Sequence, residues 1–423
     1  MRCSSRFICS PVTVDCSRRF SCYFIFGRGH NFCYAVSMVL TPNEVLDRCA
    51  TLSVALGERA AEAEQLRRLP PATMDDLERL DLFRLVVPTS LGGHGMGFDT
   101  LAHSTRLLGH GCVASAWTIS FLVMHNFMLA KFPAAAREEL FPAEHPWSLV
   151  PAPLAPTGRV EVVEGGYRVS GRWEWATGVH HSNWIMVSTI QTEPELAARF
   201  VLVPTSDASV EDVWHTSGMR ATGSDTVVLD DVFVPEHRTL RGADLMTGGE
   251  VIGGDGMSLL PVPQVLALVA SAPALGAAEA AVELYRARIE QRVLAYSFGE
   301  RAIDQSAAHI RLGQVISDLD GLRSRWDAAV DELSSYAGTG EVPLDRRMAL
   351  RLTAAATVRG ARSIVNTIAE GAGASVYMSA SPFQRFQRDL EVLKGHVIFD
   401  WDRTVELAGR VALGLPLKPT DMV

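Results

Sequence analysis

The sequence has few of the residues that mark a disulfide-rich, metal-binding or nucleic-acid-binding protein. Five of its seven cysteines precede residue 38, which leaves only Cys49 and Cys112 for the rest of the chain. Two cysteines cannot build a disulfide framework, so we expect a reducing, cytoplasmic compartment. The chain has no C-x-x-C pair and no H-E-x-x-H motif, and we therefore expect no metal site. A formal net charge of −9 argues against a nucleic-acid partner.

Membrane-spanning and nicotinamide-binding signals are also scarce. The apolar stretch 113–130 contains His125 and Asn126, and two strongly polar side chains are costly in a lone membrane span. This stretch therefore predicts a buried core helix, and we expect no membrane segment. The glycine-rich segment 91–97 follows no strand and has no downstream acid to complete a dinucleotide fingerprint, which favours a connecting loop.

What is present is the composition of a globular protein of 423 residues with 48% apolar and 21% charged residues, long enough for two or three units. Its first 37 residues differ from the rest, with five arginines, many serines and a single acid, Asp15. That composition is typical of a transit peptide. The alternative that we favour is a non-native or disordered extension of the reading frame, with Met38 as the true start.

The pattern along the chain predicts three domains and a linker after residue 37. Residues 38–147 have helical periodicity, and a capping box at 41–44 with Pro42 in the first turn predicts where the first helix begins. Residues 148–243 hold short β-branched runs separated by turn residues, as in a β-barrel or sandwich. Residues 244–258 form a glycine-rich linker, and residues 259–423 predict four long helices in an antiparallel bundle. The predicted fold class is α+β.

Five segments carry a family resemblance. They are YRVSGRWEWATG at 167–178, WHTSGMRATGS at 214–224, VFVP at 232–235, SPFQR at 381–385 and RDL at 388–390. In this order they resemble the acyl-CoA dehydrogenase superfamily over residues 41–415. The resemblance implies an N-terminal helical domain, a central β domain and a C-terminal four-helix bundle.

Within that superfamily the chain most resembles the two-component flavin-dependent monooxygenases. These include the oxygenase components of 4-hydroxyphenylacetate hydroxylase, dibenzothiophene monooxygenase and polyketide-tailoring hydroxylases. The ending, DWD at 400–402 and ELAGRVALG at 406–414, is similar to theirs. Many dehydrogenases of the superfamily carry a catalytic glutamate nine residues after the arginine of the RD pair. Here that position is Val397, which cannot act as a general base.

The resemblance implies a reaction and its partners. A separate NAD(P)H:flavin reductase supplies reduced FMN or reduced FAD, and O2 adds to the flavin to give a C4a-hydroperoxide. Its terminal oxygen then hydroxylates an aromatic or polyketide-like small molecule in a pocket that excludes water. We also expect the protein to be a homotetramer.

Two histidines are the catalytic candidates. His396 occupies the position where the similar oxygenases carry a histidine near the flavin, and an imidazole can hydrogen-bond a peroxide or accept a phenolic proton near neutral pH. His125 lies in the segment that supplies a substrate-contacting histidine in those enzymes. For each, the alternative is a structural histidine whose nitrogens are satisfied by neighbours.

Candidate flavin-binding residues come from two regions. In the first, Ser148 is a candidate contact for flavin N5, and Trp175, Thr177 and Gly178 match the stretch that lines the flavin ring. A tryptophan in the core of the sheet is the alternative for Trp175. The adjacent histidines at 180 and 181 do not favour a metal pair, because neighbouring strand residues face opposite sides.

The second region holds flavin phosphate, often from a neighbouring subunit, in the similar proteins. Arg292 and the Phe298-Gly299 pair match the arginine and Phe-Gly segment, although Arg286 and Arg288 compete with Arg292. A glycine-rich turn matches the turn that approaches the flavin across the subunit interface; its candidate residues are Gly371, Gly373 and Ser375.

Three other functions stay open. One is an acyl-CoA dehydrogenase of the same fold, and another is an amino-sugar N-oxygenase. The third is a non-catalytic binding protein that has kept the fold without binding flavin.

Overall fold

The fold begins at Pro42, the first residue of α1 (Pro42–Leu66), as the capping box predicted. The computed structural model describes residues 21–22, 35–36, 39–247, 253, 257–418, 421 and 423. The predicted extension at 1–37 lies outside these residues, except for the antiparallel two-residue strands β1 (Ser21–Cys22) and β2 (Ala35–Val36). Residues 1–41 and 42–423 form two separate units, and the following description concerns the second.

Helices make up the first part of this unit. After α1 come α2 (Pro71–Arg79), α3 (Phe98–Gly111), α4 (Val113–Leu129) and α5 (Ala134–Leu140). Every residue of α4 except Phe121 is buried, so the apolar stretch is a core helix, as predicted. It packs against α3, α7 and α10 and against the turn Arg220–Thr222 of the β domain. Helix α4 therefore lies where the first helical part, the β domain and the bundle meet.

A seven-stranded sheet follows, in the order β7-β8-β4-β3-β5-β6-β9. The strands are β3 (Gly158–Val163), β4 (Gly166–Ala176), β5 (Trp184–Gln191), β6 (Ala197–Pro204), β7 (Ser209–Glu211), β8 (Asp225–Pro235) and β9 (Thr239–Arg241). Strands β3 and β5 are parallel, and the other neighbours are antiparallel. Trp173 is fully buried in the core of this sheet, where its indole N–H donates to the carbonyl of Ser188 over 2.7 Å.

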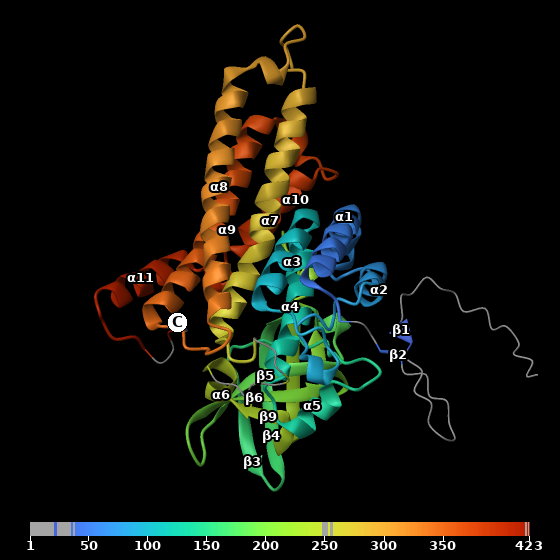
Figure 1. Cartoon of the computed structure of the whole chain (residues 1–423), viewed down its shortest axis with the longest axis vertical. Helices are drawn as coiled ribbons and strands as arrows, with labels where there is room; N and C mark the ends of the chain where they lie inside the picture. The colour runs from blue at the N-terminus through green and yellow to red at the C-terminus, as the bar shows by residue number, and fades with distance from the viewer. Residues whose placement is uncertain are drawn as a thin grey trace, which may run out of the picture. The chain divides into compact units, whose positions relative to one another are not determined.

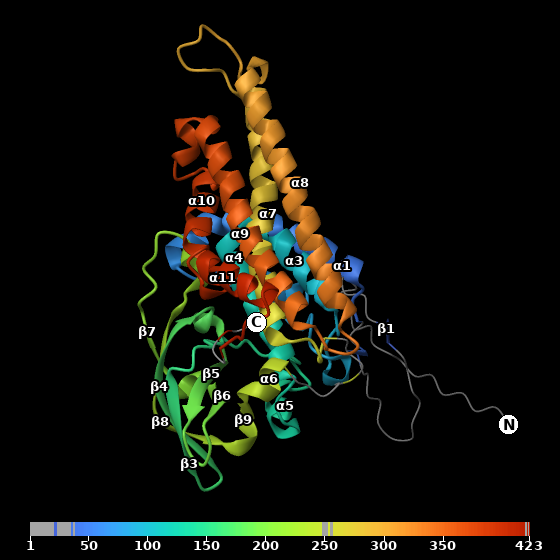
Figure 2. The same ribbon diagram turned by 90° about the vertical axis from the view of Figure 1, so that its left-hand side faces the viewer.

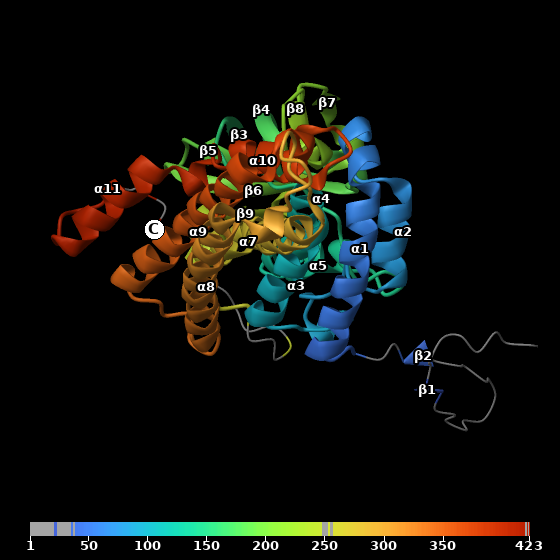
Figure 3. The same cartoon turned by 90° about the horizontal axis from the view of Figure 1, so that it is seen from above.

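The chain then returns to helix. The elements are α6 (Gly242–Thr247), α7 (Val262–Gln291), α8 (Ser306–Ser335), α9 (Leu344–Ala372), α10 (Pro382–Leu393) and α11 (Trp401–Ala412). Figures 1 and 2 show α7, α8 and α9 running side by side away from the sheet, and Figure 3 shows α10 beside α9. The four bundle helices are therefore three long ones and the short α10. The first residues of the proposed linker, 244–247, belong to α6.

Helices α3 and α7 approach each other closely because both carry glycine at the contact. A Cβ on Gly109 would lie 2.6 Å from the carbonyl oxygen of Pro273, and one on Gly276 would lie 2.1 Å from that of Arg106. Among the described residues, α7 is the one helix long and apolar enough to cross a membrane, and 94% of its most apolar window is buried inside the protein. That burial is typical of a core helix.

Candidate active site

An aromatic row runs along α4 and joins both candidate histidines. Trp117, Phe121 and His125 are four residues apart, so they lie on one face of the helix. Their ring centroids are 4.5 Å apart for Trp117 and Phe121 and 5.4 Å apart for Phe121 and His125. The ring of His396 meets Trp117 at 5.3 Å. We call these four residues the aromatic row.

His125 is held as a neutral imidazole with an open acceptor. Its side chain is 1% exposed, and burial lowers its pKa to about 4. The nitrogen Nδ1 lies 2.5 Å from the carbonyl oxygen of Val150, which can only accept, so Nδ1 carries the proton. Nε2 is then a lone-pair acceptor, and it is buried without a hydrogen-bond partner among the described residues.

His396 has the opposite tautomer. It caps the short helix η8 (Val397–Phe399), where its Nδ1 accepts the backbone N–H of Ile398 over 3.3 Å. Its Nε2 therefore carries the proton in the neutral ring. Burial alone lowers the pKa of His396 to about 4, with no carboxylate contributing. The aromatic row thus has an imidazole acceptor at His125 and an imidazole donor at His396.

Thr177 and Gly178 lie against the same helix. A Cβ on Gly178 would lie 3.1 Å from Cδ2 of Leu122 in α4, and its φ of +76° is in the left-handed region that favours glycine. The hydroxyl of Thr177 accepts the indole N–H of Trp117 over 3.4 Å. Three predicted site residues, Thr177, Gly178 and His396, therefore contact α4, the helix that carries the fourth, His125.

Trp175 is not a core residue, because its side chain is 62% exposed. The core tryptophan of this strand is Trp173. Trp175 has a left-handed φ of +65° where β4 ends, and its carbonyl accepts the amide N–H of Thr177 over 2.9 Å. An exposed indole two residues before Thr177 is free to cover a flat ligand.

Ser148 lies beside α4, but its hydroxyl is already used. Its amide N–H donates to Oδ1 of Asn126 over 2.9 Å, and its Oγ donates to the carbonyl of Leu140 over 2.6 Å. A different hydroxyl, that of Ser224, contacts Thr177 at 2.9 Å. Ser224 is the last residue of the 214–224 motif, and the motif alone predicts no role for its hydroxyl. Only the folded chain shows that the hydroxyls of Thr177 and Ser224 lie within hydrogen-bonding distance.

The remaining candidates except Phe298 gather where α7 and α9 end, at the end of the bundle away from the sheet (Figure 1). Arg292 donates to the carbonyl of Gly371 over 2.9 Å, and Arg288 donates to the Ser375 hydroxyl over 2.6 Å. A Cβ on Gly373 would lie 2.4 Å from Arg292 Nη2, and the φ there is +81°. Arg288, Arg292 and Arg311 line a cavity of about 220 Å³ at this turn. We call this group the arginine turn.

Phe298 does not join the arginine turn. It projects fully exposed from the loop between α7 and α8, as does Tyr296. Both residues have left-handed φ, of +52° and +60°. Of the two competing arginines, Arg288 reaches the turn together with Arg292. Arg286 instead pairs with Glu290 at 3.8 Å.

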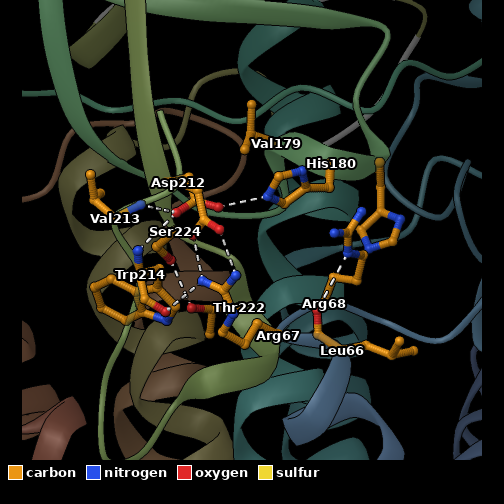
Figure 4. A network of polar contacts seen from close by, with 12 residues as sticks. Leu66, Arg67, Arg68, Val179, His180, Asp212, Val213, Trp214, Thr222 and Ser224 are labelled. Atoms are coloured by element: carbon orange, nitrogen blue, oxygen red, sulfur yellow. Dashed lines mark hydrogen bonds and ion pairs between the residues drawn. The ribbon is translucent and has the colours of Figure 1, made fainter. Parts of the chain in front are cut away.

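The adjacent histidines of η2 (Val179–His181) diverge. Nε2 of His180 lies 2.6 Å from Oδ2 of Asp225, whereas Nε2 of His181 accepts the backbone N–H of Leu69 over 3.1 Å. Figure 4 shows His180 in the polar network around the 212–224 segment. Within the described ranges, no cluster of three His, Cys, Asp or Glu side chains could hold a metal ion.

These groups fit a flavin. An exposed indole at Trp175 and a hydroxyl at Thr177 suit a planar ring with hydrogen-bonding edges. The guanidinium groups of the arginine turn suit phosphate. The partnerless buried Nε2 of His125 is an acceptor that awaits a donor from a bound molecule.

Comparisons with known proteins also indicate a flavin-dependent enzyme. Residues 268–401 match the family model of the acyl-CoA dehydrogenase C-terminal domain. The pigment production hydroxylase of Rhodococcus sp. (strain ATCC 21145) is 33% identical over 386 residues, which cover 90% of this chain and 99% of that protein. HsaA, the oxygenase subunit of a flavin-dependent monooxygenase of Mycobacterium tuberculosis (strain ATCC 25618 / H37Rv), is 34% identical over 369 residues, covering 85% and 92%.

A solved structure shares the fold over the same length. XiaF from Streptomyces sp., in complex with FADH2 and glycerol, has a TM-score of 0.83 and 28% identity, and the match covers 90% of this chain and 96% of XiaF. The helix–sheet–helix architecture is thus that of the acyl-CoA dehydrogenase superfamily, as the sequence motifs predicted. Within it, the chain belongs to the flavin-dependent monooxygenases, as an oxygenase component.

Proposed function

We propose that this oxygenase component takes reduced FMN or reduced FAD from a separate NAD(P)H:flavin reductase and hydroxylates an aromatic or polyketide-like small molecule. When bound, reduced flavin supplies two electrons to O2, so that one oxygen atom enters the substrate and the other leaves as water. The observation that carries the proposal is the aromatic row, in which two neutral imidazoles of opposite hydrogen-bonding sense flank aromatic rings. The names of its relatives, a pigment production hydroxylase and a flavin-dependent monooxygenase, support it.

Each residue of the aromatic row has a distinct part. The open Nε2 of His125 accepts a hydrogen bond from a substrate hydroxyl and so orients the substrate. The Nε2–H of His396 donates to the oxygen being transferred. Between them, the rings of Trp117 and Phe121 exclude water from the reacting atoms.

The two groups of flavin candidates then divide the cofactor. Trp175, Thr177 and Gly178 would hold the ring system, next to the aromatic row. Ser148 remains in the block that supports α4, and because its hydroxyl proton goes to Leu140, a contact with flavin N5 would use Ser148 as the acceptor. The arginine turn, with Gly371, Gly373 and Ser375, would hold phosphate through Arg292 and Arg288.

We further propose that the enzyme is a homotetramer. Tyr296 and Phe298 are fully exposed, and large apolar side chains on a protruding loop are typical of a surface that another chain covers. With this loop packed on a neighbouring subunit, Phe298 would lie near the phosphate of the flavin that is bound to that subunit. We place the enzyme in the cytoplasm, without a membrane or nucleic-acid partner.

The test is a single-turnover reaction without the reductase. The protein is mixed anaerobically with chemically reduced FAD or FMN and a panel of phenols, and then with oxygenated buffer. Hydroxylated product and hydrogen peroxide are both quantified. Product formation at the expense of peroxide supports the proposal, and peroxide alone with every phenol contradicts it.

A second arm separates the dehydrogenase alternative. The protein is incubated anaerobically with oxidised FAD and acyl-CoA thioesters, and flavin absorbance is followed. Bleaching of the oxidised flavin would favour an acyl-CoA dehydrogenase. We expect no bleaching, because Val397 replaces the expected glutamate and no carboxylate affects His396.

A further inference from the structure

Three hydroxyl groups of the β domain form a hydrogen-bonded chain that begins at Thr177. Thr177 Oγ1 lies 2.9 Å from Ser224 Oγ, and Ser224 Oγ lies 2.7 Å from Thr222 Oγ1. Thr222 Oγ1 in turn lies 2.9 Å from the carbonyl oxygen of Met219. We call Thr177, Ser224 and Thr222 the hydroxyl relay. Ser224 and Thr222 are 3% and 2% exposed, so water does not compete for their hydrogen bonds.

Counting protons gives the relay a direction. Each hydroxyl has one proton, and a carbonyl oxygen can only accept. Thr222 must therefore donate to Met219. The proton of Thr222 is then used, so Ser224 must donate to Thr222. By the same reasoning Thr177 must donate to Ser224. The relay ends at Thr177 with no proton left to offer.

The accepting end of the relay is fixed in place. The backbone N–H of Met219 donates to Oδ1 of Asp389 over 2.6 Å, and its carbonyl also accepts the indole N–H of Trp214 over 2.9 Å. Gly223 turns the chain between the two relay hydroxyls with a φ of +48°, and a Cβ there would lie 2.7 Å from the carbonyl oxygen of Arg67.

Neighbouring contacts hold the same segment. Asp225 accepts the backbone N–H groups of Val213 and Trp214, both over 2.8 Å. Arg67 forms a two-pronged ion pair with Asp212 (Figure 4), with distances of 2.5 and 2.6 Å. The backbone N–H of Gly178 donates to the carbonyl of Thr222 over 2.9 Å, which ties the segment to the turn that carries Thr177. These contacts hold the backbone that carries the relay and so keep its three oxygens within hydrogen-bonding distance.

We propose that the hydroxyl relay makes Thr177 a hydrogen-bond acceptor only, and that Ser224 and Thr222 thereby select reduced over oxidised flavin. Reduced flavin carries a ring N–H that the oxidised ring replaces with a lone pair. Trp117 occupies one lone pair of Thr177 through a long contact of 3.4 Å, which leaves the other for a ring donor. Oxidised flavin would place a lone pair against a lone pair. This inference rests on the proposed function; Ser224 and Thr222 act through Thr177 as positioning residues.

The experiment compares binding of the two redox forms. Dissociation constants are measured for oxidised FAD in air and for dithionite-reduced FAD under anaerobic conditions, and the midpoint potential of bound flavin is recorded. We expect the wild-type protein to bind the reduced form more tightly. In Ser224→Ala, Thr177 regains a free proton, and the ratio of oxidised to reduced dissociation constants should fall about tenfold. A tenfold fall lowers the two-electron midpoint potential by about 30 mV.

Three further variants complete the test. Thr222→Val should lower the ratio in the same direction, because Ser224 is then free to donate to Thr177. Ser224→Thr keeps the hydroxyl and should restore the wild-type ratio. Ser182→Ala is the matched control, since its Oγ donates to the carbonyl of Val179 nearby and lies outside the relay. It should leave the ratio unchanged.

The outcomes separate this inference from the proposed function. A wild-type preference for reduced FAD that persists in both Ser224→Ala and Thr222→Val overturns the relay while leaving the proposed function intact. An equal fall of the ratio of dissociation constants in Ser182→Ala also overturns the relay, because the effect is then not specific to Ser224 and Thr222. Wild-type protein that binds neither form overturns both. Should Ser224→Ala fail to fold, Thr222→Val gives the answer alone.

Discussion

The imidazole of His396 meets the indole of Trp117 edge to face, with ring centroids 5.3 Å apart and ring planes inclined by 69°. Trp117 belongs to the first helical part of the chain, and His396 follows the last helix of the bundle. The same indole donates to Thr177 of the β domain. One side chain therefore touches all three parts of the fold at the candidate site.

His396→Ala should uncouple the reaction. Removing the imidazole deletes the Nε2–H donor but leaves Trp175, Thr177 and Gly178, so reduced-flavin affinity should change little. The yield of product per flavin oxidised should fall about tenfold, the worth of one strong hydrogen bond, and hydrogen peroxide should rise to match. Product and peroxide are quantified in single turnovers. His145→Ala, at an exposed histidine, is the control. Unchanged coupling in His396→Ala would remove His396 from the mechanism.

The burial of His125 should make the fold sensitive to acid. Its folded pKa of about 4 is below the ordinary value of 6.5, so between these values the unfolded chain binds the proton more readily. The contribution of His125 to stability is therefore fully present above pH 6.5 and is lost as the pH falls toward 4.

The size of this acid effect follows from the shift in pKa. It amounts to roughly 2 kcal/mol between pH 7.5 and pH 5. Urea unfolding at both pH values should show that His125→Gln loses less stability on acidification than wild type. Identical losses in the two proteins would show that His125 is not buried as a neutral ring.

Asp389 should act in the opposite direction. Burial raises the pKa of its carboxyl group to about 6, against the partial offset of the Met219 N–H and the Arg388 charge. The folded state therefore holds the proton more tightly than the unfolded chain between about pH 4 and pH 6, and stability falls as the pH rises through that window. From pH 4.5 to pH 7 this cost is roughly 2 kcal/mol.

Asp389→Asn tests that cost while keeping an oxygen for the Met219 N–H. The variant should lose less stability than wild type as the pH is raised from 4.5 to 7, measured by urea unfolding. It should also keep the preference for reduced flavin, because the Met219 anchor is preserved. A variant with the same pH dependence as wild type would contradict the assignment of this titration to Asp389.

Glu279 is the ionic centre of the helical core. This buried carboxylate of α7 accepts hydrogen bonds from Arg106 and His110 of α3 and from Arg323 of α8, the last two over 2.8 Å. Burial raises its pKa, but these donors outweigh burial and lower it to about 2. Its contribution to stability is present above pH 4.5 and is lost as the pH falls toward 2.

Glu279→Ala should destabilise the protein by about 3–5 kcal/mol, since it leaves the guanidinium of Arg106 partly buried without its main counter-charge. Urea unfolding at pH 7 measures the change. Arg346→Ala is the control, because it removes an exposed arginine that pairs with Glu332, and the unfolding midpoint should stay where it is. A small effect of Glu279→Ala would mean that α3, α7 and α8 are held together by apolar packing alone.

The layers of the fold could be predicted from local patterns. Helical periodicity marked α1, α4 and the long helices, and the runs at 160–163 and 167–171 lie in the paired strands β3 and β4. The prediction of four long bundle helices was too simple, because α10 is short. Hydrophobic spacing indicates which segments are helical, but it does not specify how long each helix is. That length also depends on the space that the neighbouring helices leave.

The candidate site could also be predicted only in part from the sequence. Motif position led to His125, Thr177 and His396, and the structure places Thr177 and His396 against α4, the helix that carries His125; their chemical roles remain predictions. Ser148 as a contact of flavin N5 stays a prediction, and the structure adds that its hydroxyl donates to Leu140 and that a second hydroxyl, Ser224, meets Thr177. Nothing in the spacing of residues 177 and 224 indicates that their side chains meet.

By itself, therefore, the sequence determined the order of helical and β parts, the family, and the residue types available for catalysis, because these depend on periodicity and on motifs along the chain. Only the tertiary structure decided the proton positions on His125 and His396 and the direction of the hydroxyl relay. Those depend on which carbonyl or amide group lies within hydrogen-bonding distance. Val150 and Ser224 reach His125 and Thr177 only when distant segments pack together, and Met219 and Ile398 reach Thr222 and His396 only when the local turns form.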